Sequence, residues 1–166
     1  DRIALLSEGR NAWVISELGI LYAGGVNVPL SVKLDELSEL KFRIEHSETK
    51  YIIVSKNHIH KIRQLLNQFT NVEKVIVLDE INLVNEKEIH FSEVNSMGNK
   101  LLVNNKNIFD ERWQSIKGND YANICYTSGT TADPKGIILS HRNYTSNVEQ
   151  ACSLMKIEEH FRTLLI

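Results

Sequence analysis

The alternation of short apolar runs with helix-like stretches constrains the fold of this chain more than any other feature of its sequence. The runs "VNVPL" (26–30), "YIIVS" (51–55) and "KVIVL" (74–78) are rich in β-branched side chains, which favour buried strands. Between these runs, apolar residues recur at helical spacing. Buried strands that alternate with amphipathic helices are typical of a parallel sheet covered on both faces. We therefore expect an α/β fold, layered around a parallel sheet with right-handed crossovers.

The segments beside the expected strands predict helices. Residues 10–23 are expected to form a mostly buried helix that ends at Gly24 and Gly25. A second helix begins at Asp35, and a third spans residues 59–69. The expected inward faces are Val14, Leu18, Leu21 and Tyr22 in the first helix, Leu37, Leu40 and Ile44 in the second, and Ile59, Ile62, Leu65, Leu66 and Phe69 in the third.

The second half of the chain is less regular. Residues 79–91 are polar and predict a surface connection, and residues 91–103 and 109–116 predict two short helices. The run "YANICYT" (121–127) predicts a strand that passes through a polar loop into a second strand, "GIILS" (136–140).

A helix is expected after Ser140, whose hydroxyl is suited to cap it. Its expected apolar face consists of Tyr144, Val148, Ala151, Cys152 and Met155. The domain map then has a first α/β sheet region (1–80), a helical connection (81–120) and a strand–loop–strand–helix region (121–166). We expect all three to belong to one large amino-terminal domain, with two sheet regions joined near residues 80–105.

Charge and composition exclude several kinds of partner. The 19 basic and 21 acidic side chains give a net charge of −2, so no basic field exists to bind nucleic acid. The most apolar stretch, residues 12–26, contains Glu17 and is shorter than the about 20 residues of a membrane span. Cys125 and Cys152 lie at no paired or metal-like spacing, which favours a reducing compartment, so we expect a cytoplasmic protein.

The two ends of the sequence suggest a piece of a longer protein. The chain begins at Asp1 instead of methionine, and it ends on the apolar run "TLLI" without a turn signal. A complete small protein with a processed terminus is the alternative interpretation.

The polar loop after the strand at 121–127 carries the chemistry of the chain. The stretch "TSGTTADPK" offers several hydroxyls, a glycine that permits close approach, and one lysine. Such donors and a cation are what a multiply charged phosphate group needs. The spacing excludes a Walker A loop, because Pro134 precedes Lys135 and Gly136 follows it. A serine nucleophile is also excluded, because no G-x-S-x-G elbow surrounds Ser128.

The sequence "YTSGTTADPKG", followed by "ILSHRN", resembles the phosphate-binding signature of the adenylate-forming superfamily, which includes acyl-CoA synthetases, luciferases and peptide-synthetase adenylation domains. The upstream stretches "ALLSEGRNAWVISELGILYAGGVNVPL" and "ELKFRIEHSETKYIIVS" are similar to the amino-terminal segments of bacterial long-chain fatty acid CoA ligases. The resemblance therefore covers nearly all of the chain and implies the layered fold of acetyl-CoA synthetase. It assigns Thr127, Ser128, Gly129, Thr130, Thr131 and Lys135 to the grip on the β- and γ-phosphates of ATP. In one departure from the pattern, Ala132 stands where the family usually has glycine.

The resemblance also implies an activity for the parent protein. In this family a carboxylate attacks the α-phosphate of Mg-ATP, pyrophosphate leaves, and coenzyme A takes the acyl group. ATP, Mg²⁺, coenzyme A and a long-chain fatty acid are thus the implied cofactors and substrates, with coenzyme A bound by parts outside this chain. The family's later motifs and carboxy-terminal domain are absent from the sequence, so we assign no catalytic or metal-binding residue and expect the chain alone to be inactive.

Several alternatives stay open from sequence alone. The parent protein could activate an amino acid for a carrier protein, or the chain could be a non-catalytic nucleotide-binding module. Peripheral association with a membrane and self-association through exposed sheet edges are also left open. His58 and His60 are interpreted as a surface pair and not as a metal site. His141 either approaches the phosphate from the start of its helix or is an ordinary residue of the first turn.

Overall fold

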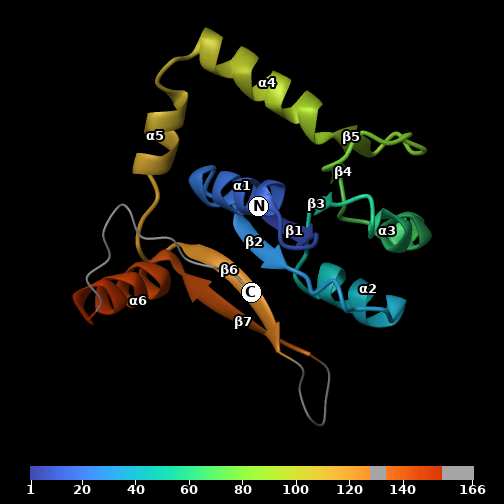
Figure 1. The fold of residues 1–166 in the computed structure, drawn as a ribbon, viewed down its shortest axis with the longest axis horizontal. Coiled ribbons are helices and arrows are strands. Elements are labelled where there is room, and N and C mark those ends of the chain that lie inside the picture. Colours follow the sequence, from blue (N-terminus) through green and yellow to red (C-terminus); the bar gives the residue numbers. More distant parts are fainter. Residues whose placement is uncertain (128–133, 155–166) are drawn as a thin grey trace.

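The computed structural model describes residues 1–127 and 134–154, and its architecture is a sheet with helices on both faces (Figure 1). The strands are β1 (Arg2–Leu6), β2 (Val26–Pro29), β3 (Tyr51–Val54), β4 (Lys74–Val77), β5 (Glu88–His90), β6 (Tyr121–Thr127) and β7 (Lys135–Ser140). The helices are α1 (Asn11–Tyr22), α2 (Leu37–His46), α3 (Ile59–Leu65), α4 (Phe91–Asn104), α5 (Ile108–Gln114) and α6 (His141–Leu154), with a 3₁₀ turn, η1 (Leu66–Gln68), directly after α3.

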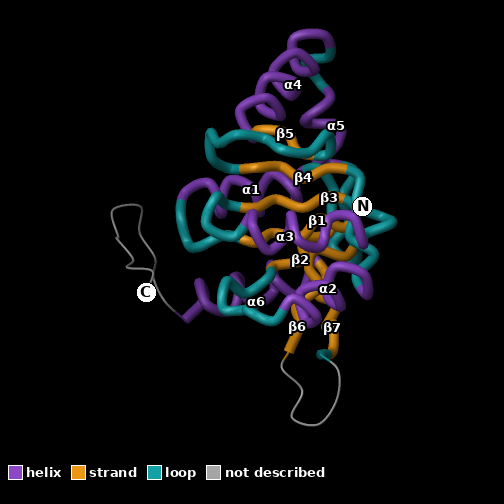
Figure 2. The backbone as a smooth tube through the Cα atoms, turned by 90° about the vertical axis from the view of Figure 1, so that its right-hand side faces the viewer, coloured by secondary structure: helices purple, strands orange, loops and turns teal. Residues whose placement is uncertain are grey.

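The described strands form a seven-stranded sheet in the order β5-β4-β3-β1-β2-β6-β7. Neighbours from β5 to β6 pair in parallel, and β7 pairs antiparallel with β6 at the edge. The predicted α/β fold around a parallel sheet is therefore confirmed. Because β6 pairs with β2, the strands of both expected sheet regions lie in one sheet (Figure 2).

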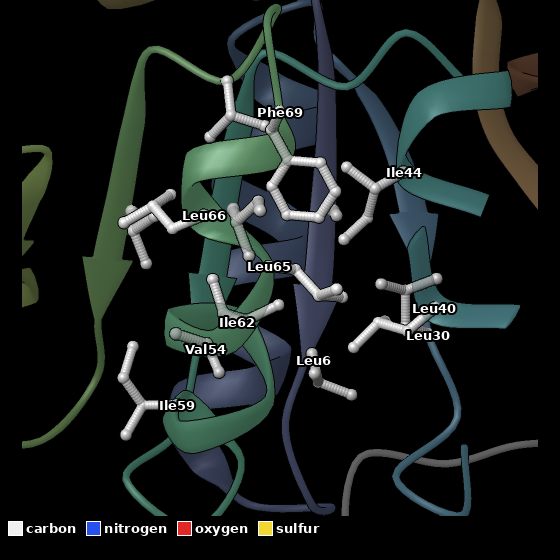
Figure 3. Packing of buried hydrophobic residues seen from close by; sticks show 14 of the residues in the cluster. Leu6, Leu30, Leu40, Ile44, Val54, Ile59, Ile62, Leu65, Leu66 and Phe69 are labelled. Atoms are coloured by element: carbon white, nitrogen blue, oxygen red, sulfur yellow. The ribbon is translucent and has the colours of Figure 1, made fainter. Parts of the chain in front are cut away.

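The main core lies between the sheet and the helices α2 and α3 (Figure 3). Leu6 faces this core, whereas its neighbour Leu5 faces a smaller cluster on the other side of the sheet with Ile20 of α1, because successive strand residues point to opposite faces. The predicted inward faces of α2 and α3 are confirmed. Their fully or almost fully buried members are Leu40, Ile44, Ile59, Ile62, Leu65, Leu66 and Phe69.

The expected inward face of α1 is wrong. Val14, Leu18 and Tyr22 are 46%, 48% and 47% exposed, and the residues that α1 buries are Ser16 and Ile20. The helix is apolar around most of its circumference, so spacing alone could not identify the face that contacts the sheet.

The end of α1 is fixed by the two glycines that the sequence predicts there. Gly24 adopts a positive φ of 70°, which glycine tolerates without strain. Gly25 packs so closely that an added Cβ would lie 2.8 Å from Cδ1 of Ile3 in β1. The glycine pair thus stops the helix and lets the chain enter β2 beside β1.

The predicted short helices are present as α4, which follows β5, and α5, which contacts α1 through the rings of Phe109 and Tyr22 (Figure 1). They bury none of their residues, and α6 buries none of its described residues. The expected apolar face of α6 is therefore not covered: Tyr144 is 40% and Val148 is 60% exposed. Among the described helices, none has the length and hydrophobicity needed to span a bilayer.

Candidate functional site

The polar loop that the sequence singles out connects two strands of one hairpin. β6 and β7 pair along most of their length, and their last register pair before the loop joins Thr127 to Lys135 (Figure 2). On its other side β6 is held by β2, through the parallel pair Asn27 and Asn123. The loop therefore extends from a sheet edge that β2 and the core behind it support.

Two of the six predicted phosphate-binding residues lie in the described part of the chain. Thr127 and Lys135 are brought together as register partners, and both are exposed. The other four, Ser128, Gly129, Thr130 and Thr131, lie outside the described residues, as does Ala132. Their assignment stays a prediction.

The described end of the hairpin has the donor chemistry that a polyphosphate needs. Thr127 contributes a hydroxyl and Lys135 an ammonium group, and both belong to exposed residues at the same end of the strand pair. A lysine ammonium is a compact charge with three donors, well suited to phosphate oxygens. The two residues fit ATP phosphates by donor type. Within the described ranges no group of three or more His, Cys, Asp or Glu side chains could hold a metal ion.

Gly136 is required by the packing behind this end. It pairs with Tyr126 across the hairpin. An added Cβ would lie 3.1 Å from Cγ2 of Ile124 and 3.4 Å from the ring of Tyr126. A side chain at position 136 would therefore crowd Ile124, and the glycine avoids this contact.

Tyr126 links the hairpin to the carboxyl-terminal end of α2. Its hydroxyl lies 2.8 Å from Nδ1 of His46 and 3.3 Å from the carbonyl oxygen of Arg43. Burial raises the pKa of Tyr126, so the phenol stays protonated at neutral pH. The motif contains Tyr126, but no spacing in the sequence indicates that His46 is its partner, so sequence reasoning missed this contact.

His141 lies at the opposite end of β7 from Lys135. It follows the last residue of β7, and its backbone N–H donates to the carbonyl oxygen of Asp120, 3.1 Å away, just before β6. Six residue steps of about 3.3 Å each separate it from Lys135, a distance of roughly 20 Å along the strand. The loop residues 128–133 lie outside the described part of the chain, so the role of His141 stays a prediction.

The start of α6 is capped as predicted. The hydroxyl of Ser140 accepts the backbone N–H of Asn143 at 3.4 Å, and the side-chain oxygen of Asn143 accepts the backbone N–H of Ser140 at 2.8 Å. Two backbone donors at the helix start are thus satisfied reciprocally, as in a capping box.

Polar side chains fix β6 from the face that α1 and α6 cover. The amide of Asn123 donates to the hydroxyl of Tyr144 at 2.7 Å, and that of Asn27 donates to Glu17 at 3.2 Å. Cys125, on the same strand as Asn123, is half-buried, and burial raises the pKa of its thiol. A protonated, partly covered thiol is a poor nucleophile.

The histidines at 58 and 60 do not share a site. His58 lies 3.8 Å from a carboxylate oxygen of Glu8, whereas His60 is exposed on α3. Burial, followed by the nearby charge of Lys61, lowers the pKa of His58. The imidazole is therefore neutral at pH 7.

The fold and the hairpin define the class of the chain: it is an amino-terminal α/β region of the adenylate-forming type, with a polar strand–loop–strand hairpin at the edge of a mostly parallel sheet. The family model of AMP-binding enzymes matches residues 1–165. The chain belongs to this family.

Named relatives and solved structures agree with this assignment. A long-chain-fatty-acid–[acyl-carrier-protein] ligase of Arabidopsis thaliana is 29% identical over 160 residues, which are 90% of this chain and 22% of that protein. A long-chain-fatty-acid–CoA ligase of Xenopus laevis is 25% identical over 159 residues, 95% of this chain and 21% of that protein. The structure of a putative long-chain-fatty-acid CoA ligase from Rhodopseudomonas palustris superposes with a TM-score of 0.73 at 14% identity, over 96% of this chain and 36% of that one.

These matches cover only part of each related protein. The chain spans about a fifth of the length of the two curated relatives. By name, one of these relatives is a ligase for an acyl-carrier protein and the other a ligase for CoA.

Proposed function

We propose that the parent protein is an ATP-dependent acyl-CoA synthetase that activates a long-chain fatty acid as its acyl-adenylate and transfers the acyl group to coenzyme A. The observation that carries the proposal is the register of the hairpin, which pairs Thr127 with Lys135 at the base of the predicted phosphate loop. The names of the two curated relatives support a long-chain acyl substrate.

The described residues would act on the leaving group. When bound, Mg-ATP supplies the electrophilic α-phosphate that the carboxylate attacks. Lys135 would neutralise charge on the pyrophosphate portion, and the Thr127 hydroxyl would orient it by a hydrogen bond. Both residues are held by strand pairing on rigid elements, so they contribute positioning as well as charge. We propose no nucleophile or general base in this chain.

The test is carboxylate-dependent ATP–pyrophosphate exchange by the full-length protein that contains this sequence. Exchange with long-chain fatty acids, lost in Lys135→Ala, is the expected result. Lys74→Ala is the matched control, because Lys74 is likewise an exposed lysine at the first position of a strand. The control should retain exchange within about twofold, as expected for a surface substitution away from the site.

Other results would redirect or refute the proposal. Exchange with amino acids only would indicate that the protein activates amino acids. The absence of exchange with any carboxylate would indicate a non-catalytic nucleotide-binding module. The isolated chain of residues 1–166 is expected to form no acyl-CoA. Acyl-CoA formation by this chain alone would contradict the expectation that the catalytic groups lie elsewhere.

A further inference from the structure

The carboxyl-terminal end of α2 contacts the phosphate-loop hairpin directly, although 80 residues separate His46 from Tyr126 in the sequence. The Tyr126 hydroxyl lies 2.8 Å from Nδ1 of His46 and 3.3 Å from the carbonyl oxygen of Arg43, and the Ser47 side chain is a further hydrogen-bonding neighbour. Both contacts form together when Nδ1 of His46 carries a proton and donates to the phenol, which then donates to the carbonyl. The phenol oxygen is thus held by hydrogen bonds to residues at the carboxyl-terminal end of α2.

Ring contacts hold the same pair from the sides. The His46 ring stacks on Phe42, with centroids 5.1 Å apart at 21°, and meets the edge of the Tyr126 ring at 5.8 Å and 72°. The guanidinium carbon of Arg43 lies 5.8 Å from the centroid of the Tyr126 ring. Such contacts each favour one orientation of the tyrosine ring.

The helix α2, to which Tyr126 is bonded, is firmly packed. α2 is fixed in the main core by Leu40 and Ile44, which are 0% and 1% exposed. Arg43 is buried and pairs with Glu39 one helical turn earlier, at 2.9 Å. A contact to this end of α2 therefore connects β6 to the most firmly packed part of the chain.

Tyr126 transmits this anchoring to both described phosphate-binding residues. It directly precedes Thr127 on β6, and its register partner Gly136 directly follows Lys135 on β7. A Cβ added at Gly136 would lie 3.4 Å from the tyrosine ring, so the ring occupies the space beside this part of β7. We propose that His46 and Tyr126 are positioning residues, which hold Thr127 and Lys135 at the separation that ATP phosphates require.

This inference rests on the proposed function, and it is tested in the full-length protein. Tyr126→Phe removes only the hydroxyl. It should raise the KM for ATP in pyrophosphate exchange about fivefold, the value of one lost hydrogen bond, and leave the KM for the carboxylate unchanged. Tyr121→Phe is the matched control, because Tyr121 is an exposed tyrosine at the far end of the same strand. It should leave both constants unchanged.

Substitutions of His46 give an independent test, which includes a variant expected to recover part of the lost ATP affinity. His46→Leu should raise the KM for ATP like Tyr126→Phe. His46→Asn, whose amide places a polar atom near the position of Nδ1, should restore part of the loss. His60→Leu is the control for removal of an exposed histidine. Thermal unfolding of every variant separates positioning from stability, because a merely structural contact would lower Tm and the active fraction without changing the KM for ATP.

Each outcome of these measurements either supports or overturns the proposed positioning role of His46 and Tyr126. An unchanged KM for ATP in Tyr126→Phe, or an equal rise in Tyr121→Phe, would overturn the inference. If the wild-type protein exchanges with no carboxylate, the proposed function fails, and the dissociation constant of ATP measured by calorimetry replaces KM. A similar rise in that constant for Tyr126→Phe and His46→Leu would then support positioning, and no ATP binding by wild type would overturn both proposals.

Discussion

The ion pair between Arg63 and Glu88 gives the sharpest prediction about stability. The Glu88 side chain is 0% exposed, and its two oxygens accept hydrogen bonds from Nε and Nη2 of Arg63 at 2.8 Å each. The backbone N–H of Val84 donates to the same carboxylate at 3.0 Å. Burial acts to raise the pKa of Glu88, but these bonds outweigh it and hold the pKa below its ordinary 4.5. The pair ties α3 to β5.

Replacing Arg63 by methionine keeps much of the side-chain stem and leaves the buried carboxylate without its cation. The carboxyl can escape this state by binding a proton. Between its ordinary pKa of 4.5 and pH 7, protonation costs about 3.4 kcal/mol, at about 1.36 kcal/mol per unit. We therefore expect Arg63→Met to lower the free energy of unfolding by about 3 kcal/mol at pH 7, near the range measured for broken buried pairs.

The pKa of Glu88 in each protein also determines how the free energy of unfolding depends on pH. In the variant the folded-state pKa of Glu88 lies above 4.5, so its stability falls as pH rises from 4.5 toward that value. In the wild type the pKa is lowered, so the contribution of the pair is present above 4.5 and is lost below it. As long as the Glu88 carboxyl of the folded variant holds its proton, the difference in unfolding free energy between the two proteins should shrink by about 1.4 kcal/mol per pH unit as pH falls from 7 toward 5.

Urea denaturation at pH 7, 6 and 5 measures this difference. Arg2→Met is the matched control, because its partner Glu48 is exposed and surface pairs contribute about 0–1 kcal/mol. The double variant Arg63→Met/Glu88→Met should regain much of the lost stability, since no buried charge remains. A loss below about 1 kcal/mol at pH 7, or one that does not change with pH, would refute the reasoning.

Two further predictions concern other sites. Gly136→Ala should destabilise the protein by about 1–3 kcal/mol in urea denaturation, because its Cβ would lie 3.1 Å from Cγ2 of Ile124, closer than an ordinary carbon–carbon contact. Gly98→Ala, in α4 with no atom within 4 Å of the added Cβ, should instead stabilise by about 0.5–1 kcal/mol, and equal losses at both glycines would contradict the packing argument. Burial lowers the pKa of His58 below 6.5, so stability should fall as pH drops below about 6.5, and His58→Gln should flatten that slope in unfolding curves between pH 7 and 5. An unchanged slope would mean that another group titrates there.

The sequence predicts the central strands of the sheet well because their signal is local. "YIIVS" and "KVIVL" are apolar runs bounded by polar residues, and they correspond to β3 and β4. β5 was missed because its three residues lie within a polar stretch, and β1 because no helix or turn precedes the run "RIALL". Such strands exist through pairing with neighbours, which periodicity does not report.

The candidate site was located by its motif and not by its surroundings. Thr127 and Lys135 are adjacent because the loop closes a hairpin, which the two flanking apolar runs indicate. The contact of His46 with Tyr126 depends on the packing of α2 against the sheet, and a single sequence contains no signal for it.

The position of β6 beside β2 has a consequence for synthesis of the protein on the ribosome. β1 to β4 lie within the first 77 residues and can pair early, but the free side of β2 finds its neighbour only when β6 emerges. About 100 residues separate the two strands, so at about 5–20 residues per second the edge of β2 stays unpaired for roughly 5–20 seconds. During that interval the nascent chain presents an open, parallel strand edge, the kind of template on which chains associate. The phosphate-loop hairpin is thus also the element that closes this edge, and variants that weaken it are expected to aggregate during synthesis before they lose any activity.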